Sequence, residues 1–228
     1  IIHIAAYYGR LDIIKYARQY NCSWEVNSAI GYRPWIDLYF KNLRNGFERF
    51  REFENEYEVY LTCQIASSRN NFEIVKYAIE NHCPYDAFAL IRACNNNNLE
   101  ILKLIDNTNK VPLYPILLPQ SAYYESIDCL TYVLENGCES SSPIISSSIA
   151  CIEKLKSYGY EINCVESACL CIERSKDHSS FEYCLDNCKN KNDVFDKILG
   201  KTIEYNNLEC LKILHKQTKY RSFSSDAN

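Results

Sequence analysis

Residues 97–105 read NNLEILKLI, and this short stretch decides the fold of the chain. The first leucine, Leu99, follows a pair of Asn and precedes an acidic residue, two apolar residues, a lysine and two more apolar residues. Apolar residues at this leucine, which we call the anchor, and two, three, five and six positions later share one face of a 3.6-residue helix. The stretch therefore predicts an amphipathic helix that begins at Leu99.

The same pattern recurs along the 228 residues, clearly at seven places and more loosely at an eighth. Such recurrence indicates helix-pair units that stack on one another, because one pair cannot bury its apolar face alone. We expect the anchors to be buried, so that Leu99→Ala destabilises the fold by roughly 2–5 kcal/mol. The anchors are 22 to 36 residues apart, at Leu11, Phe47, Phe72, Leu99, Ile127, Ile149, Phe181 (the loose match) and Leu208.

Turn residues separate two helices within each unit. A shorter apolar stretch precedes the anchors, as at residues 2–6 and 61–66, and predicts the first helix. Gly and Asn adopt a positive φ more readily than other residues, so we expect a left-handed residue two positions before the anchor. These positions are Gly9, Asn45, Asn70, Asn97 and Asn206.

Composition excludes several classes of protein. Six Gly and six Pro are too few for an all-β chain with many tight turns, and a net charge of −4 predicts no nucleic-acid partner. No apolar run approaches the roughly 20 residues that cross a bilayer, so we expect no membrane association. An odd count of 13 Cys in a chain long enough to have its own core favours reduced thiols and a cytoplasmic protein.

The opening residues 2–15, IHIAAYYGRLDIIK, resemble the ankyrin repeat, whose usual form is T-P-L-H-x-A-A-x-x-G-H-L-E-I-V-K. The family's Thr-Pro is missing throughout, and its His survives only at His3. Cys-Ser-Trp at 22–24 and Cys-Pro-Tyr at 83–85 are similar to a Cys-Pro-Trp variant found in ankyrin arrays of large DNA viruses and protists.

This resemblance implies an all-α, ankyrin-like helical-pair solenoid of about seven to eight degenerate repeats over residues 1–217. The array would begin inside a repeat and have irregular units near 30–58 and 140–180. Residues 218–228 are polar and predict a disordered tail.

The resemblance also implies a non-enzymatic scaffold that binds a partner protein through its concave face and inter-repeat loops, without cofactor or metal. An alternative is the substrate-recognition part of a larger protein, such as a ubiquitin-ligase adaptor or a viral host-range factor. A viral protein would act in the host-cell cytoplasm. Aromatic residues and arginine are typical binding hot spots. The candidates near loops and first helices are Trp24, Tyr32, Arg33, Trp35, Tyr85, Tyr123 and Tyr124.

Two other groups of residues could carry chemistry. A cluster of five Cys near His178 suggests zinc, but its only close pair with zinc-like spacing is Cys184 and Cys188, so buried thiols are the favoured interpretation. No Cys lies in a recognisable catalytic arrangement with His, which argues against a thiol enzyme. The other three Cys of the cluster are Cys164, Cys169 and Cys171.

Overall fold

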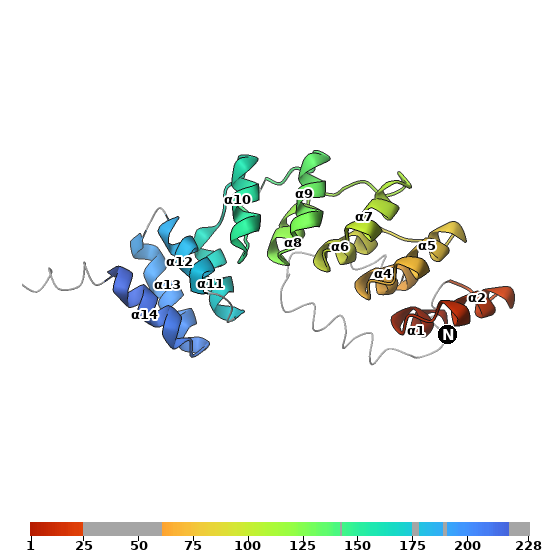
Figure 1. The fold of residues 1–228 in the computed structure, drawn as a ribbon, viewed down its shortest axis with the longest axis horizontal. Coiled ribbons are helices and arrows are strands. Elements are labelled where there is room, and N and C mark those ends of the chain that lie inside the picture. Colours follow the sequence, from red (N-terminus) through yellow and green to blue (C-terminus); the bar gives the residue numbers. More distant parts are fainter. Residues whose placement is uncertain (25–60, 142, 175–177, 189–190, 219–228) are drawn as a thin grey trace, which may run out of the picture. The chain divides into compact units, whose positions relative to one another are not determined.

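The computed structural model describes residues 1–24, 61–141, 143–174, 178–188 and 191–218 (Figure 1). Within these ranges all regular secondary structure is helical, with 13 α-helices, so the predicted all-α class is confirmed. None of the described helices combines the length and the apolar character needed to cross a bilayer. The chain divides into two compact units, Ile1–Pro112 and Leu113–Asn228, which we describe separately.

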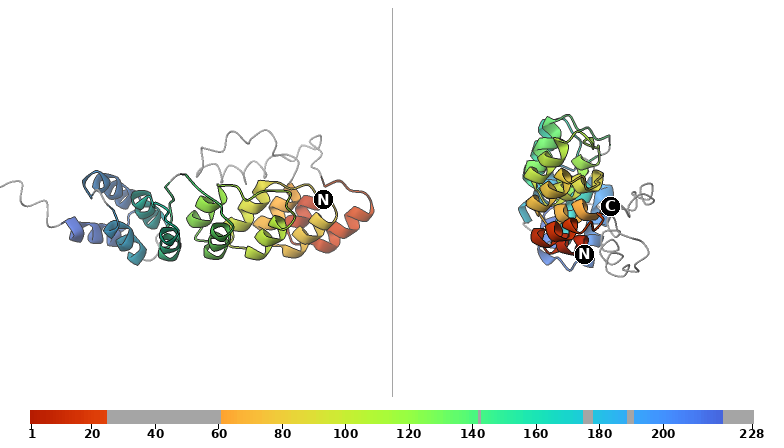
Figure 2. Two further views of the ribbon diagram at one scale, coloured as in Figure 1. Left: turned by 90° about the horizontal axis from the view of Figure 1, so that it is seen from above. Right: turned by 90° about the vertical axis from the view of Figure 1, so that its right-hand side faces the viewer.

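The described residues of the first unit form three helix pairs, each closed by a short turn. Within each pair the helices contact one another, and the first helices α1, α4 and α6 also contact in that order, so the pairs stack side by side (Figure 2). The pairs are α1 (Ile2–Tyr7) with α2 (Leu11–Gln19), α4 (Leu61–Ser68) with α5 (Phe72–Glu80), and α6 (Ala87–Asn95) with α7 (Leu99–Asp106).

The first two of these pairs are direct neighbours, although residues 25–60 separate them in the sequence. The Asn71 side-chain amide donates to the Ala6 carbonyl at 3.0 Å, and the Trp24 indole N–H donates to the Asn81 carbonyl at 3.1 Å. The sequence predicted a further unit, anchored at Phe47, between these pairs. That unit lies outside the described residues, and α1 contacts α4 directly.

Among its described residues, the second unit has three helix pairs and one helix without a partner of its own. Residues 143–148, which precede α10, form no helix; Ile144 instead makes a parallel bridge with Ile162. The helices are α8 (Leu117–Tyr123), α9 (Ile127–Glu135), α10 (Ile149–Ser157), α11 (Cys164–Glu173), α12 (His178–Asp186), α13 (Lys191–Glu204) and α14 (Leu208–Thr218).

The predicted left-handed turn residues are confirmed wherever the structure describes them. Gly9, Asn70, Asn97 and Asn206 have φ values of +70°, +56°, +51° and +48°. Glu125 occupies the equivalent position before α9 with φ +60°, which its residue type did not predict. A left-handed residue ends the first helix and reverses the chain into the second, so the pairs share one turn geometry. Asn45 lies outside the described residues.

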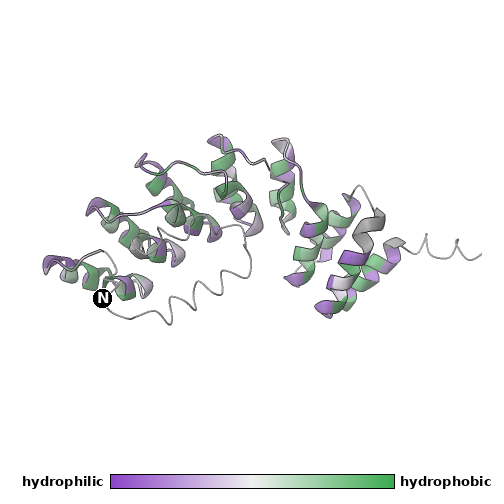
Figure 3. Cartoon of the chain, turned by 180° about the vertical axis from the view of Figure 1, so that it is seen from behind, coloured by the Kyte–Doolittle hydropathy of each residue, from purple (hydrophilic) through white to green (hydrophobic). Residues whose placement is uncertain are grey.

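Burial of the anchors confirms the prediction at Phe181, which is 0% exposed, and differs from it at the other described anchors. Leu99 is only partly buried, whereas Ile101, Leu102 and Ile105, which follow it on α7, are each 0% exposed. The anchor is the first residue of its helix, and a helical side chain leans toward the N-terminus, so Leu99 lies at the margin beside the turn. The core is therefore built mainly from residues two, three and six positions after the anchor, together with the anchor Phe181. Figure 3 shows polar residues at the helix ends and apolar residues along the helices.

Candidate functional site

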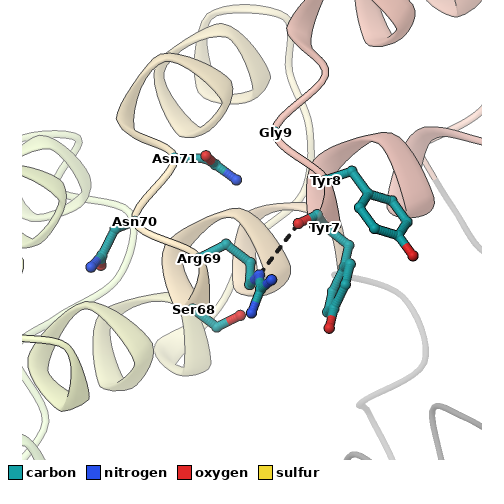
Figure 4. Close-up of a pocket in the computed structure, with 7 residues that line it drawn as sticks. All are labelled: Tyr7, Tyr8, Gly9, Ser68, Arg69, Asn70 and Asn71. Atoms are coloured by element: carbon teal, nitrogen blue, oxygen red, sulfur yellow. Dashed lines mark hydrogen bonds between the residues drawn. The ribbon is translucent and has the colours of Figure 1, made fainter.

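Two tyrosines and an arginine form an exposed cluster at the turns of the first two helix pairs (Figure 4). The rings of Tyr7 and Tyr8 meet edge to face with centroids 5.1 Å apart. The Arg69 guanidinium lies 4.2 Å from the Tyr7 ring centroid, and its Nε donates to the Tyr7 carbonyl at 3.3 Å. A cation over an aromatic face is attracted by the ring quadrupole, so the arginine fixes the first ring and leaves the second, 69% exposed, at the surface.

An open depression of about 410 Å³ lies beside this cluster. The described residues that line it carry one positive charge, on Arg69, and no negative charge. Gly9 allows its backbone to lie close to the Asn71 side chain, because a Cβ at this position would be 3.1 Å from the Asn71 side-chain oxygen. The other lining residues are Tyr7, Tyr8, Ser68, Asn70 and Asn71.

The second unit contains a cluster of the same composition. Tyr123 and Tyr124 end α8 as Tyr7 and Tyr8 end α1, and their rings meet edge to face with centroids 5.2 Å apart. The Arg174 guanidinium lies 4.8 Å from the Tyr123 ring centroid and donates to the Tyr123 carbonyl at 2.6 Å. The same arrangement is thus built twice, from arginines at unrelated positions of the repeat.

Arg174 has more partners than its counterpart in the first unit. Its guanidinium also donates to the Glu125 carboxylate at 2.8 Å and to the Ser147 hydroxyl oxygen at 2.9 Å. The Ser147 hydroxyl donates to the same carboxylate at 2.6 Å. Because residues 143–148 form no helix, Arg174 reaches from the end of α11 across this segment to the turn between α8 and α9.

The structure separates the predicted binding residues. Tyr123 and Tyr124 lie together in the turn cluster and are partly buried. Tyr85 is partly buried in the loop after α5, and its hydroxyl donates to the Thr108 hydroxyl oxygen at 2.7 Å. Trp24 is only 6% exposed, so little of its ring is accessible to a partner. The remaining candidates, Tyr32, Arg33 and Trp35, lie outside the described residues.

Trp24 instead joins the first two helix pairs. Arg18 lies 4.7 Å above its indole ring, and His3 Nε2 donates to its carbonyl oxygen at 3.1 Å. Burial lowers the pKa of His3 to about 4, against the opposing effect of this hydrogen bond. His3 is therefore neutral at neutral pH, and it ties α1 to the loop after α2.

Sequence reasoning missed Tyr7, Tyr8 and the two arginines. A signal was present for the tyrosines: Tyr-Tyr occupies the positions four and three before the anchor at both Leu11 and Ile127. No comparable signal marks the arginines, because each contacts its tyrosine from another helix pair, 62 residues away for Arg69 and 51 residues away for Arg174.

Cys171, Cys184 and Cys188 of the cysteine-rich helices are buried, and their thiols form hydrogen bonds. Cys184 and Cys171 share a thiol hydrogen bond that, with burial, raises the pKa of Cys184. The Cys188 thiol donates to the Cys184 carbonyl at 3.2 Å. Among the described residues, no group of three or more His, Cys, Asp or Glu is placed to hold a metal ion.

All 13 Cys lie among the described residues and form no disulfide there, and eleven are buried. Burial raises the pKa of Cys169 and of Cys210 to about 11, so both thiols stay protonated at neutral pH. Since the thiolate is the nucleophile, such groups suit packing better than covalent chemistry. The sequence matches no family model, and a search of curated proteins finds no match either.

Proposed function

We propose that this chain is an ankyrin-like stack of helix pairs that acts as a non-enzymatic protein-interaction module. The observation that carries the proposal is the repeated cluster of two tyrosines and an arginine at the helix turns. Tyr7 with Arg69, and Tyr123 with Arg174, share ring geometry, guanidinium placement and a carbonyl contact. Packing alone does not require this surface, because the turn of α6–α7 has Asn95 and Asn96 at the equivalent positions.

The chemistry of the first cluster suits a protein partner. Tyr and Arg are enriched at interface hot spots because they combine a large apolar area with polar groups. Tyr8 presents a 69% exposed ring, and Arg69 is exposed beside it. With a positive and no negative side chain among the described residues of the depression, we expect an acidic or carbonyl-rich segment to bind there.

This proposal moves the binding surface that the sequence predicted. The resemblance placed it on the concave face and the inter-repeat loops, where Trp24 and Tyr85 lie. The Trp24 indole already donates a hydrogen bond to the Asn81 carbonyl, and the Tyr85 hydroxyl donates one to the Thr108 hydroxyl oxygen. The turns between the two helices of a pair are therefore the better-supported site.

The test is a selection of short peptides, displayed on phage, against the immobilised chain, followed by titration of the best binder. We expect Tyr8→Ala to weaken binding about tenfold or more, the loss of a typical hot-spot residue of at least about 1.4 kcal/mol. Tyr20→Ala is the matched control, because Tyr20 is 68% exposed but lies at the opposite end of its helix pair. Equal affinities for wild type and Tyr8→Ala would contradict the proposal.

A further inference from the structure

The two clusters of tyrosines and arginine differ in what binds the arginine. In the second unit, the Arg174 guanidinium donates to the Tyr123 carbonyl at 2.6 Å and to the Glu125 carboxylate at 2.8 Å. In the first unit, Arg69 Nε donates to the Tyr7 carbonyl at 3.3 Å, and the described residues give its Nη1 and Nη2 no hydrogen-bond partner. The first cluster therefore repeats the rings, the arginine and the carbonyl of the second, but it has no carboxylate.

The residue that supplies the carboxylate in the second cluster is a glycine in the first. Glu125 and Gly9 each follow the two tyrosines directly, two residues before an anchor, and have φ values of +60° and +70°. Because side-chain direction follows backbone conformation, a side chain at Gly9 would start out as the Glu125 side chain does. The Asn71 side-chain oxygen lies 3.1 Å from where that Cβ would be, so Asn71 restricts this route. The first cluster is thus built without an acid of its own.

The open depression lies where this acid is missing. Its lining includes Gly9, Arg69 and both tyrosines of the first cluster (Figure 4). The end of the guanidinium that carries Nη1 and Nη2 matches the two oxygens of a carboxylate, which accept a pair of parallel hydrogen bonds. The Tyr7 ring and carbonyl already hold Arg69, so less side-chain freedom is lost when an anion binds.

We propose that the first cluster binds the carboxylate of a glutamate or aspartate side chain of a partner protein, in the place that the Glu125 carboxylate takes in the second cluster. This inference rests on the proposed interaction module and names the chemical group that its first cluster binds. The second cluster shows the occupied arrangement, in which one guanidinium joins a tyrosine carbonyl to a carboxylate. In the first cluster, the exposed Tyr8 ring packs against the chain around the acid.

The test is an NMR titration of the isotope-labelled 228-residue chain, in which the Nε–H signal of Arg69 is followed. The probe is the pentapeptide Gly-Gly-Glu-Gly-Gly, acetylated and amidated so that the side-chain carboxylate is its only charge. We expect the Arg69 signal to shift and saturate below about 50 mM, since a single charge-assisted contact gives an affinity in the millimolar range. The peptide with Gln in place of Glu should bind at least about fivefold more weakly. Arg10, which is exposed and has no described side-chain partner, is the internal control and should show no saturable shift.

Two substitutions locate the site within the first unit. Arg69→Met should abolish the saturable shift of the Gly9 backbone amide that the Glu peptide causes in wild type. Lys76→Met removes one positive charge from the same unit at an exposed position of α5 and should bind as wild type does. Far-UV circular dichroism checks that both variants fold.

A third substitution tests whether the two clusters are equivalent. Glu125→Gly removes the internal carboxylate and gives the second cluster the Tyr-Tyr-Gly sequence of the first. The Arg174 Nε–H signal should then respond to the Glu peptide, whereas in wild type it should not. The wild-type titration decides the inference even if this variant does not fold.

The inference is overturned if the Gln peptide binds as tightly as the Glu peptide, or if Arg69→Met and Lys76→Met bind alike. It is also overturned if only acetylated pentaglycine with a free terminal carboxylate saturates Arg69, because the bound group is then a chain terminus. A folded Glu125→Gly variant in which Arg174 stays silent contradicts the equivalence. Selected peptides whose binding depends on Tyr8 but not on Arg69 would remove this inference and leave the proposed interaction surface standing.

Discussion

Leu99 and Leu102 lie on the same helix, and comparing them tests where the core of the first unit lies. Leu102 is 0% exposed, so truncation to Ala removes a fully buried side chain and leaves a cavity in the stack. Such a change costs about 2–5 kcal/mol of unfolding free energy. Leu99 is partly buried at the start of α7, so its truncation should cost about 1 kcal/mol, nearer the average for single substitutions. We expect Leu102→Ala to be clearly the more damaging change.

The measurement is urea unfolding followed by far-UV circular dichroism at one pH and one protein concentration. Because stacked repeats can unfold in parts, the two variants are compared by the shift of the earliest transition as well as by its slope. If Leu99→Ala shifts the transition as far as Leu102→Ala, the anchors form the core after all, and the assignment to later helix positions is wrong.

Three further predictions concern buried polar groups and thiols. Because the pKa of His3 is lowered from 6.5 to about 4, this side chain takes up a proton at a higher pH in the unfolded chain than in the folded chain. The contribution of neutral His3 to the free energy of unfolding is therefore complete above pH 6.5, and at most about 3 kcal/mol is lost as the pH falls toward 4. His3→Gln should remove that part of the pH dependence in chemical unfolding, and an unchanged profile would contradict it. Arg174→Met should destabilise the fold by about 1–3 kcal/mol in the same assay, while Lys212→Met, from an exposed ion pair with Glu209, should cost less than about 0.5 kcal/mol; equal losses would contradict the bridging role of Arg174. Ellman's reagent should react rapidly with two thiols, the partly exposed Cys22 and Cys164, and with the other eleven only on unfolding; prompt reaction of all 13 would show that the helices do not protect them.

Local requirements of the chain were predictable from the sequence. A left-handed turn needs a residue that tolerates positive φ. The residue type and spacing of Gly9, Asn70 and Asn97 predict such turns. The helices that begin at Leu11 and Leu99 follow equally from apolar periodicity. Asn also has a structural use here: the Asn98 side chain accepts from the Ile101 amide at 2.9 Å and caps α7.

Features that depend on the stack were not predictable. Periodicity shows that Leu99 and Leu102 share a face, but which turn of the helix meets the neighbouring pair is decided by packing. Direct contact between Ala6 and Asn71 could not be read from positions 65 residues apart. Arg174 reaches Tyr123, 51 residues away in the sequence, because residues 143–148 before α10 form no helix.

The candidate site was predictable in part. Tyr123 and Tyr124 stood out as aromatic residues near a turn, and the structure places them in one cluster. Trp24 was chosen for the same reason, but its indole is buried between the first two helix pairs and donates to the Asn81 carbonyl. An aromatic residue in a loop can serve packing or binding, and only its burial in the folded chain separates the two uses.

The most direct test of the proposed interaction surface is hydroxyl-radical footprinting of the chain with and without the selected peptide. Oxidation of each tyrosine ring is read by mass spectrometry, so Tyr8 and Tyr20, which are 69% and 68% exposed, are compared within one sample. Our account predicts that the bound peptide protects Tyr8 at least about twofold, the expected burial of a hot-spot ring, and leaves Tyr20 unchanged. Protection of Tyr20 with Tyr8 still fully oxidised would contradict it.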